Sequence, residues 1–124
     1  MATKQTKSEA ILKIRAKTLE TMRDWLDRQG YIEIQGPLLI PHLGEKTGFK
    51  VKLHEKIFGL SGGLQPYTDS FLEMLGKIYT IAPTFRAEPR ETNSHLIEFW
   101  RLEVNALELN LQNIMKIQED LISH

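Results

Sequence analysis

The chain has 124 residues, and its 16 basic and 16 acidic side chains give a formal net charge of zero at pH 7. This length is enough for one modest domain with its own core, and the balanced charge argues against a chain that binds RNA or another polyanion through bulk charge. The absence of cysteine excludes disulfides, thiolate metal sites and a cysteine nucleophile, and because we find neither a signal peptide nor a membrane span of about 18 apolar residues, we expect a cytoplasmic protein.

The first predicted element is a helix over residues 6–29. Thr6 and Glu9 have the form of a capping box, and Gly30 is a typical helix stop. A short strand over residues 31–34 follows. The helix carries one apolar stripe at three- and four-residue steps, made of Ile11, Ile14, Leu19, Met22, Trp25 and Leu26.

The segment over residues 38–60 carries weaker signals. Residues 49–53 alternate between apolar and polar, and residues 56–60 form another strand-like run. The Gly-Glu-Lys-Thr sequence at residues 44–47 is not a phosphate-binding loop, because the first glycine of that motif is absent and no apolar strand precedes it. His42 and His54 lack the spacing of metal ligands, so we expect both at the surface or in loops.

A glycine-containing turn at residues 61–63 leads to a predicted helix over residues 68–75, which Gly76 should end. The last predicted helix covers residues 105–123, with Asn105 and Glu108 as its cap pair. We expect its buried face to consist of Leu107, Leu111, Ile114, Met115, Gln118, Leu121 and Ile122.

Between these helices, two strand-like arms flank a polar turn at residues 89–94. Period-two alternation places Arg86 and Glu88 on one face of the first arm, and the returning arm can present Phe99 on that face. A guanidinium, a carboxylate and a flat ring together suit a nucleotide, because the cation meets phosphate and the ring stacks on the base. An ordinary hairpin with cross-strand ion pairs is the alternative interpretation.

The sequence Phe-Arg-Ala-Glu at residues 85–88, followed by a loop and His-Leu-Ile-Glu-Phe-Trp at residues 95–100, resembles motif 2 of class II aminoacyl-tRNA synthetases, in the aspartyl/asparaginyl branch. The resemblance implies that Arg86 is catalytic and contacts both the ATP α-phosphate and the amino acid carboxylate. It also implies that Glu88 holds ATP on its adenine side and that Phe99 stacks on adenine. The loop-end residues expected against the ATP phosphates are Ser94, His95 and Leu96, with Ser94 standing where the family usually has arginine.

Further segments resemble the same family. Residues 8–37 are similar in order to motif 1, the dimer-forming element, and residues 78–104 cover motif 2. Ser61 and Gln65 belong to a segment similar to the one in which a glutamine holds the amino acid. Glu45 matches a loop glutamate that contacts the substrate amino group.

The amino acid specificity that the resemblance implies depends on Thr68. Aspartyl enzymes carry a lysine three residues after the glutamine, where it pairs with the side-chain carboxylate, and Thr68 occupies that position here. A neutral hydroxyl cannot supply the charge, so the sequence favours asparagine over aspartate, or a departure in substrate.

The resemblance implies an α+β fold, part of the class II synthetase antiparallel sheet flanked by helices, in a partial catalytic domain over residues 1–124. It implies adenylate formation from ATP and aspartate or asparagine in a homodimer, with tRNA as a candidate partner and Mg²⁺ ligands expected elsewhere in the complete enzyme. We recognise no motif 3 and no anticodon-binding domain, so we expect a fragment, a minimal core or a short paralogue. Three functions stay open: an Asp/Asn synthetase core, a tRNA-independent asparagine-synthetase-like relative, and a non-catalytic dimerising or regulatory module.

Overall fold

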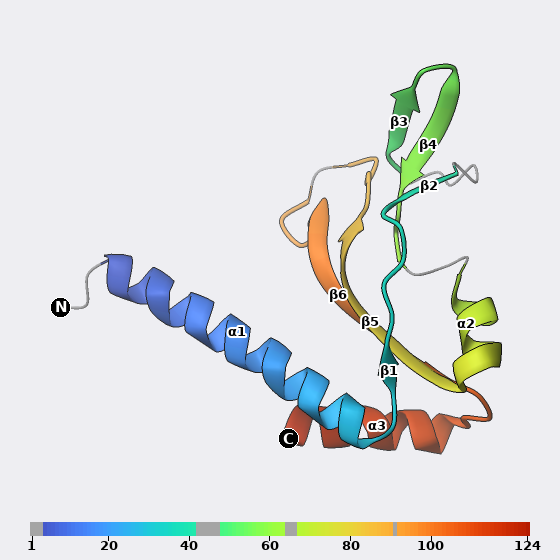
Figure 1. Cartoon of the computed structure of the whole chain (residues 1–124). Helices are drawn as coiled ribbons and strands as arrows, with labels where there is room; N and C mark the ends of the chain where they lie inside the picture. Colours follow the sequence, from blue (N-terminus) through green and yellow to red (C-terminus); the bar gives the residue numbers. More distant parts are fainter. Residues whose placement is uncertain (1–3, 42–47, 64–66, 91) are drawn as a thin grey trace. The chain divides into compact units, whose positions relative to one another are not determined.

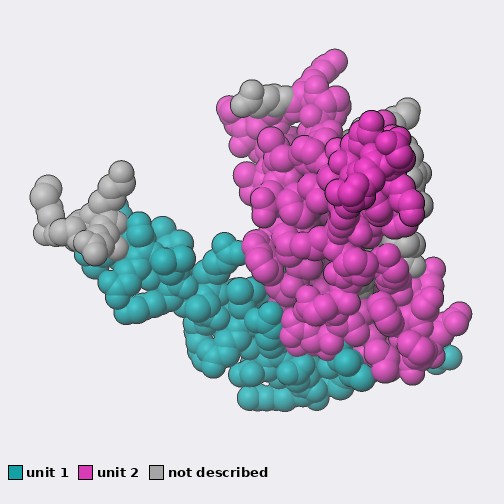
Figure 2. Space-filling model, turned by 45° about the horizontal axis from the view of Figure 1, so that its top comes forward, with its two compact units in different colours: residues 1–32, 108–124 teal, residues 33–107 magenta. Residues whose placement is uncertain are grey.

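The computed structural model describes residues 4–41, 48–63, 67–90 and 92–124. The chain divides into two compact units, residues 1–32 with 108–124 and residues 33–107, which Figure 2 shows in different colours. Helices and antiparallel strands are both present, which confirms the predicted α+β class. None of the helices in the described ranges is long and apolar enough to cross a membrane.

The first unit contains two helices, α1 (Lys4–Arg28) and α3 (Leu111–Ser123) (Figure 1). The predicted helix over residues 6–29 is confirmed as α1, with Gly30 in the turn that follows it. The predicted cap is wrong, because α1 begins at Lys4 and Thr6 therefore already lies inside the helix. An N-cap residue lies outside the helical conformation, so Thr6 cannot serve as one here.

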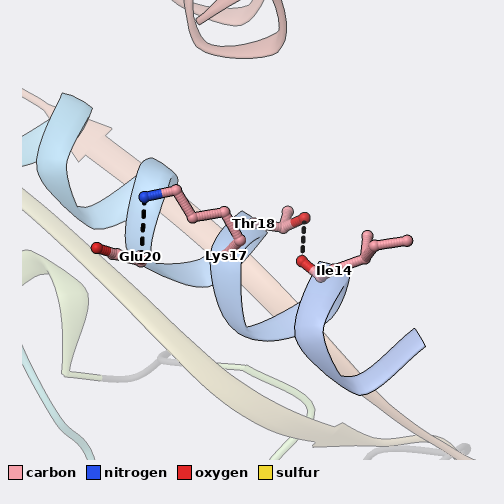
Figure 3. A network of polar contacts seen from close by, with 4 residues as sticks. All are labelled: Ile14, Lys17, Thr18 and Glu20. Carbon is pink, nitrogen blue, oxygen red and sulfur yellow. Dashed lines mark hydrogen bonds and ion pairs between the residues drawn. The ribbon is translucent and has the colours of Figure 1, made fainter. Parts of the chain in front are cut away.

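The apolar stripe of α1 is buried only near its C-terminal end. Trp25 and Leu26 are buried, whereas Ile11 is 65% and Ile14 is 66% exposed in the chain by itself. Local polar contacts run along the exposed part of the helix, as Figure 3 shows: Thr18 Oγ1 donates to the Ile14 carbonyl at 2.9 Å, and Lys17 Nζ lies 3.1 Å from Glu20 Oε2. Side-chain pairs on a helix surface contribute only about 0.2–0.5 kcal/mol each. The apolar side chains Ile11, Leu12 and Ile14 in the N-terminal half of α1 are exposed among the residues that the structure describes.

The prediction for the last helix was wrong in its start and in its buried face. Helix α3 begins after Asn110, whose side chain accepts from the Asn113 N–H at 2.9 Å, while the Asn113 side chain accepts from the Asn110 N–H at 3.2 Å. Asn105 is instead a strand residue paired with Ile78. No residue of α3 is buried, and Leu111 and Ile122 are among its most exposed side chains.

One sheet has the strand order β1-β5-β6, with β1 (Ile32–Glu33), β5 (Lys77–Phe85) and β6 (Glu98–Ala106). Both predicted arms are thus confirmed as strands, although β6 begins two residues later than expected. Strand β5 lies between the other two, so both of its edges are hydrogen-bonded, and its residues 78–81 are buried in succession, as in a strand with both faces covered. The most deeply buried of them are Ile78, Tyr79, Thr80 and Thr84.

A second antiparallel sheet has the order β2-β4-β3, with β2 (Leu39–Pro41), β4 (Lys56–Leu60) and β3 (Lys50–Leu53). The predicted strands over residues 49–53 and 56–60 are confirmed to within one residue, whereas β2 was not predicted. His54 is exposed in the turn between β3 and β4, as expected. His42 lies outside the described residues.

Helix α2 (Thr68–Leu75) belongs to the second unit and confirms the predicted helix. Gly76 ends it in a left-handed conformation, with φ of 75°, that residues with a Cβ rarely adopt. The Gly76 N–H donates to the Leu72 carbonyl at 2.8 Å, and the Gly76 carbonyl accepts from the Leu107 N–H at 3.0 Å. These bonds fix the end of α2 beside the end of β6.

Candidate functional site

An open cleft of about 730 Å³ lies within the second unit. Its lining comes from β2, the turn at residues 62–63, the start of α2, the end of β5 with the chain beyond it, and β6. The polar residues that line it are Thr68, Arg86, Glu88, Arg101, Glu103 and Asn105. The cleft therefore brings together three residues predicted from the sequence, Thr68, Arg86 and Glu88.

The register of β5 and β6 explains why the β6 residues share the cleft. Arg101 pairs with Ala82, and Glu103 pairs with Thr80. Residues two apart in a strand lie on the same face, so both charged side chains project to one side of the sheet. Thr84 pairs with Phe99, which puts the Phe99 ring on this face as well, although Phe99 is not among the residues that line the cleft.

Arg86 lies directly beyond β5, and its backbone N–H continues the strand pairing by donating to the Ile97 carbonyl at 2.9 Å. Its guanidinium Nη1 is 3.9 Å from Glu88 Oε1, and the Arg86 side chain is 51% exposed. Ion pairs at this distance and exposure contribute about 0–1 kcal/mol. The pair is too weak to engage the guanidinium fully, so Arg86 can still meet an anion in the cleft.

Arg101 and Glu103 form a second, less exposed ion pair in the cleft. Burial lowers the pKa of Arg101, and the positive charge of Arg86 lowers that pKa further. Nε of Arg101 has no hydrogen-bond partner within the part of the chain that the structure describes. Sequence reasoning missed both residues as site residues; the signal that identifies them is their alternation with Phe99 on one strand.

Ser61 holds the turn that closes one side of this site. It is buried, its backbone N–H donates to the Leu38 carbonyl at 2.8 Å, and its carbonyl accepts from the Phe85 N–H at 3.2 Å. Its Oγ accepts from the Gly63 N–H at 3.1 Å and its hydroxyl also donates to the Gly63 carbonyl. The Ser61 hydroxyl therefore fixes the turn, and its predicted contact with the amino acid stays a prediction.

Gly63 lies against the Arg101–Glu103 pair. A Cβ at Gly63 would collide with the Arg101 guanidinium and with the Glu103 carboxylate. We expect Gly63→Ala to lower the free energy of unfolding by about 1–3 kcal/mol, the range for overpacking a filled site. Urea denaturation would measure this, with Arg101→Ala as the second arm of a double-mutant cycle. If the collision is the cause, the cost of Gly63→Ala shrinks when Arg101 is already alanine; an equal cost in both backgrounds would contradict it.

The predicted phosphate-contacting residues lie in the loop between β5 and β6. Ser94, His95 and Leu96 are all exposed and do not line the cleft. The loop has its own hydrogen bonds, with Thr92 Oγ1 at 2.5 Å from His95 Nδ1. Glu45 and Gln65, predicted to contact the amino acid, lie outside the described residues.

No group of three or more acidic or histidine side chains in the described part of the chain is arranged to hold a metal ion. The cleft offers charged groups for binding, namely two guanidiniums and two carboxylates. It also contains a buried hydroxyl, Thr68 Oγ1, which has no hydrogen-bond partner in the described ranges.

Comparison with known proteins identifies the family. The family described as tRNA synthetases class II (D, K and N) matches residues 1–124. The asparagine–tRNA ligase of Pyrococcus abyssi is 37% identical over 120 residues, which are 95% of this chain and 28% of that protein.

Two solved structures extend the likeness to three dimensions. The asparaginyl-tRNA synthetase from Pyrococcus horikoshii complexed with asparaginyl-adenylate is 37% identical with a TM-score of 0.85, over 94% of this chain and 27% of that one. The asparaginyl-tRNA synthetase of Entamoeba histolytica in complex with asparaginyl-adenylate is 25% identical with a TM-score of 0.83. The match covers 94% of this chain and 26% of that one. The chain thus spans a little over a quarter of the length of these relatives, and it belongs to the class II tRNA synthetases of the D, K and N group.

Proposed function

We propose that this chain supplies the motif 2 part of a catalytic site that activates asparagine with ATP, as a step toward charging tRNA. The observation that carries the proposal is the half-exposed guanidinium of Arg86 at the cleft, directly beyond the buried strand β5. A central strand is rigid, so it holds the first residue after its end in a defined place. The relatives, an asparagine–tRNA ligase and an asparaginyl-tRNA synthetase in complex with asparaginyl-adenylate, support asparagine as the amino acid.

In the proposed reaction, a carboxylate oxygen of the amino acid attacks the α-phosphorus of ATP. The new bond joins that oxygen to phosphorus, the bond from the α-phosphorus to the bridging oxygen breaks, and pyrophosphate leaves with the electron pair. Arg86 would lie between the two reacting anions and stabilise the charge that builds up on the phosphoryl oxygens. Catalysis would therefore come from positioning and charge, without a covalent bond to the protein.

The ATP contacts follow the motif 2 resemblance. Glu88 would hold the adenine side of ATP, Phe99 would stack on the adenine ring, and Ser94, His95 and Leu96 would lie against the phosphates. Of these, Glu88 lines the cleft together with Arg86, and Phe99 shares the sheet face of Arg101. Mg²⁺ would neutralise phosphate charge in the complete enzyme, as ATP chemistry requires.

Thr68 supports asparagine over aspartate. It is buried at the cleft, and its Oγ1 has no hydrogen-bond partner within the described residues. A buried hydroxyl with free donor and acceptor capacity can serve a carboxamide, whereas it cannot neutralise a second carboxylate. We propose that Thr68 lies beside the amino acid side chain, with Ser61, Gln65 and Glu45 as further contacts predicted from the sequence.

Calorimetric titration with the two amino acids tests the proposal. Asparagine is expected to bind at least as tightly as aspartate, and Thr68→Lys should shift the ratio of the two dissociation constants toward aspartate by about tenfold or more, the effect of one hydrogen bond to a charged group. Thr68→Met is the matched control, because it adds similar length without charge. A clear preference of the unmodified chain for aspartate would contradict asparagine as the substrate.

We also propose that the chain self-associates through α1. The exposed apolar side chains Ile11, Leu12 and Ile14 lie in the segment that resembles the dimer-forming motif 1. Exposed apolar clusters of this kind mark interaction surfaces.

Sedimentation at about tens of micromolar is expected to give a species larger than the monomer. Replacing Ile11 and Ile14 together by glutamate should shift that species to the monomer, because two charges would be buried without partners. Ile57→Glu is the control, since Ile57 is 56% exposed on β4 and lies outside motif 1. A monomeric unmodified chain would contradict the proposal.

A further inference from the structure

Thr92 is the centre of the hydrogen bonds in the loop between β5 and β6. The His95 backbone N–H donates to Thr92 Oγ1 at 3.1 Å, and the same Oγ1 lies 2.5 Å from His95 Nδ1. Ser94 Oγ is further away, at 3.5 Å. One hydroxyl therefore contacts both the backbone and the ring of His95, which fixes the side chain relative to its own backbone.

The direction of the short bond follows from the capacity of each atom. A hydroxyl has one hydrogen to donate and two lone pairs to accept with. One lone pair of Thr92 Oγ1 already receives the His95 N–H, so donation of its hydrogen to Nδ1 uses the closest acceptor. In the reverse direction, two N–H groups of one residue would donate to one oxygen, and the hydroxyl hydrogen would be left to solvent or to Ser94 Oγ, at the outer limit for a hydrogen bond. We therefore take the hydroxyl as the donor in the short bond.

When Nδ1 of a neutral imidazole accepts, the ring proton must be on Nε2. Nε2 of His95 has no partner within the residues that the structure describes, and the side chain is exposed. In the neutral ring, this arrangement presents an N–H donor to solvent. Phosphate oxygens are acceptors, so such a donor can bind them.

We propose that Thr92 is a positioning residue that holds His95 in the Nε2–H tautomer, with this N–H directed to a phosphate oxygen of the bound nucleotide. The tautomer rests on the loop geometry, with the Thr92 hydroxyl as the donor in the short bond. The phosphate contact rests on the proposed function.

Nitrogen-15 NMR of the histidine side chains in the full chain tests the tautomer directly. The chain has four histidines, and His95→Gln identifies the signals of His95. In the neutral ring, Nδ1 is expected to show the shift of an unprotonated nitrogen and Nε2 that of a protonated one. Thr92→Val, which keeps the shape and removes the hydroxyl, should give a mixture of tautomers, and Thr92→Ser should restore the single tautomer.

Titration with ATP tests the second half of the proposal. Thr92→Val is expected to weaken ATP binding about two- to tenfold, the effect of losing one well-placed hydrogen bond, and Thr92→Ser should recover most of the affinity. Because Thr92 is exposed, the backbone amide spectrum of Thr92→Val should stay unchanged outside the loop. If Thr92 only stabilised the loop, the His95 ring nitrogen signals would not change to a mixture in Thr92→Val and return to a single tautomer in Thr92→Ser.

Several results would overturn the inference. A proton on Nδ1 in the unmodified chain would reverse the hydrogen bond, and an unchanged tautomer in Thr92→Val would show that Thr92 does not control it. ATP affinity that depends on Arg86 but not on Thr92 would refute the phosphate contact and leave the proposed function standing. ATP affinity that depends on neither residue would count against the proposed function itself.

Discussion

Arg86→Ala is expected to weaken ATP binding by about 1.5–3 kcal/mol, the range for a hydrogen bond to a charged group, which is roughly tenfold to more than a hundredfold in Kd. The fold should stay nearly intact, because the change removes a half-exposed side chain whose ion pair with Glu88 spans 3.9 Å. Arg86→Lys should recover only part of the affinity, since an ammonium cannot make the two-pronged contact of a guanidinium.

Two quantities measured on the same variant separate the functional role from a structural one. Calorimetry gives the ATP affinity, and thermal unfolding gives the stability. Arg28→Ala is the matched control, because Arg28 is an exposed arginine at the end of α1 and does not line the cleft. If Arg86→Ala lowers the melting temperature and leaves ATP affinity unchanged, Arg86 is a partner of Glu88 in the fold and the nucleotide role is wrong.

Ile78→Ala is expected to lower the free energy of unfolding by about 2–5 kcal/mol, the usual cost of truncating a fully buried isoleucine. Ile78 is 0% exposed on the central strand β5, so its removal leaves a cavity that neighbouring residues cannot fill completely. Ile57→Ala provides the same chemical change at a side chain that is 56% exposed. There we expect a change within about 0.5 kcal/mol.

Urea denaturation of both isoleucine variants gives the comparison. If Ile78→Ala and Ile57→Ala lowered the free energy of unfolding equally, β5 would not be the core of the second unit. The slope of the free energy against urea concentration should be the same in both variants, because a change in slope would mean that the extent of unfolding had changed.

Local sequence patterns predicted the elements whose signals are long. The helical period from Ile11 to Leu26 predicted α1, and the two arms around residues 89–94 predicted β5 and β6. Strand β2 was missed because three residues, Leu-Ile-Pro, are too few for any period to appear. Asn105 was mistaken for a helix cap because its side chain suits a cap, but ladder pairing with Ile78 extends β6 past it.

Burial was harder to predict than secondary structure. Amphipathic spacing shows which face of a helix is apolar, but it does not show what covers that face. Ile14 on α1 and Leu111 on α3 were expected to be buried and are exposed in this chain. Propensity therefore predicted the helices, while the partner of each apolar face depends on contacts that a single sequence does not encode locally.

The candidate site was predictable where a contiguous motif carried it. Arg86 and Glu88 lie within four residues of one another in a recognisable sequence, and Thr68 was identified from its spacing to Gln65. Arg101 and Glu103 alternate with Phe99 on one strand, but they were missed because the cleft that they line is formed with α2 and the turn at Gly63, which only the fold brings together. Gly63 was seen as a turn residue, and its contact with the Arg101–Glu103 pair required the fold.

The backbone hydrogen bonds of Ser61 couple the stability of separate parts of the second unit. Its N–H is bonded to Leu38, next to β2, and its carbonyl to Phe85, the residue before Arg86. Local opening at Ser61 would release both bonds in one event, and regions that open together behave as one cooperative unit. Because Phe85 precedes Arg86, an opening at Ser61 would loosen one of the two backbone bonds nearest to Arg86, while the bond from the Arg86 N–H to the Ile97 carbonyl would remain, and in this way motion of the chain beside β2 can reach the cleft.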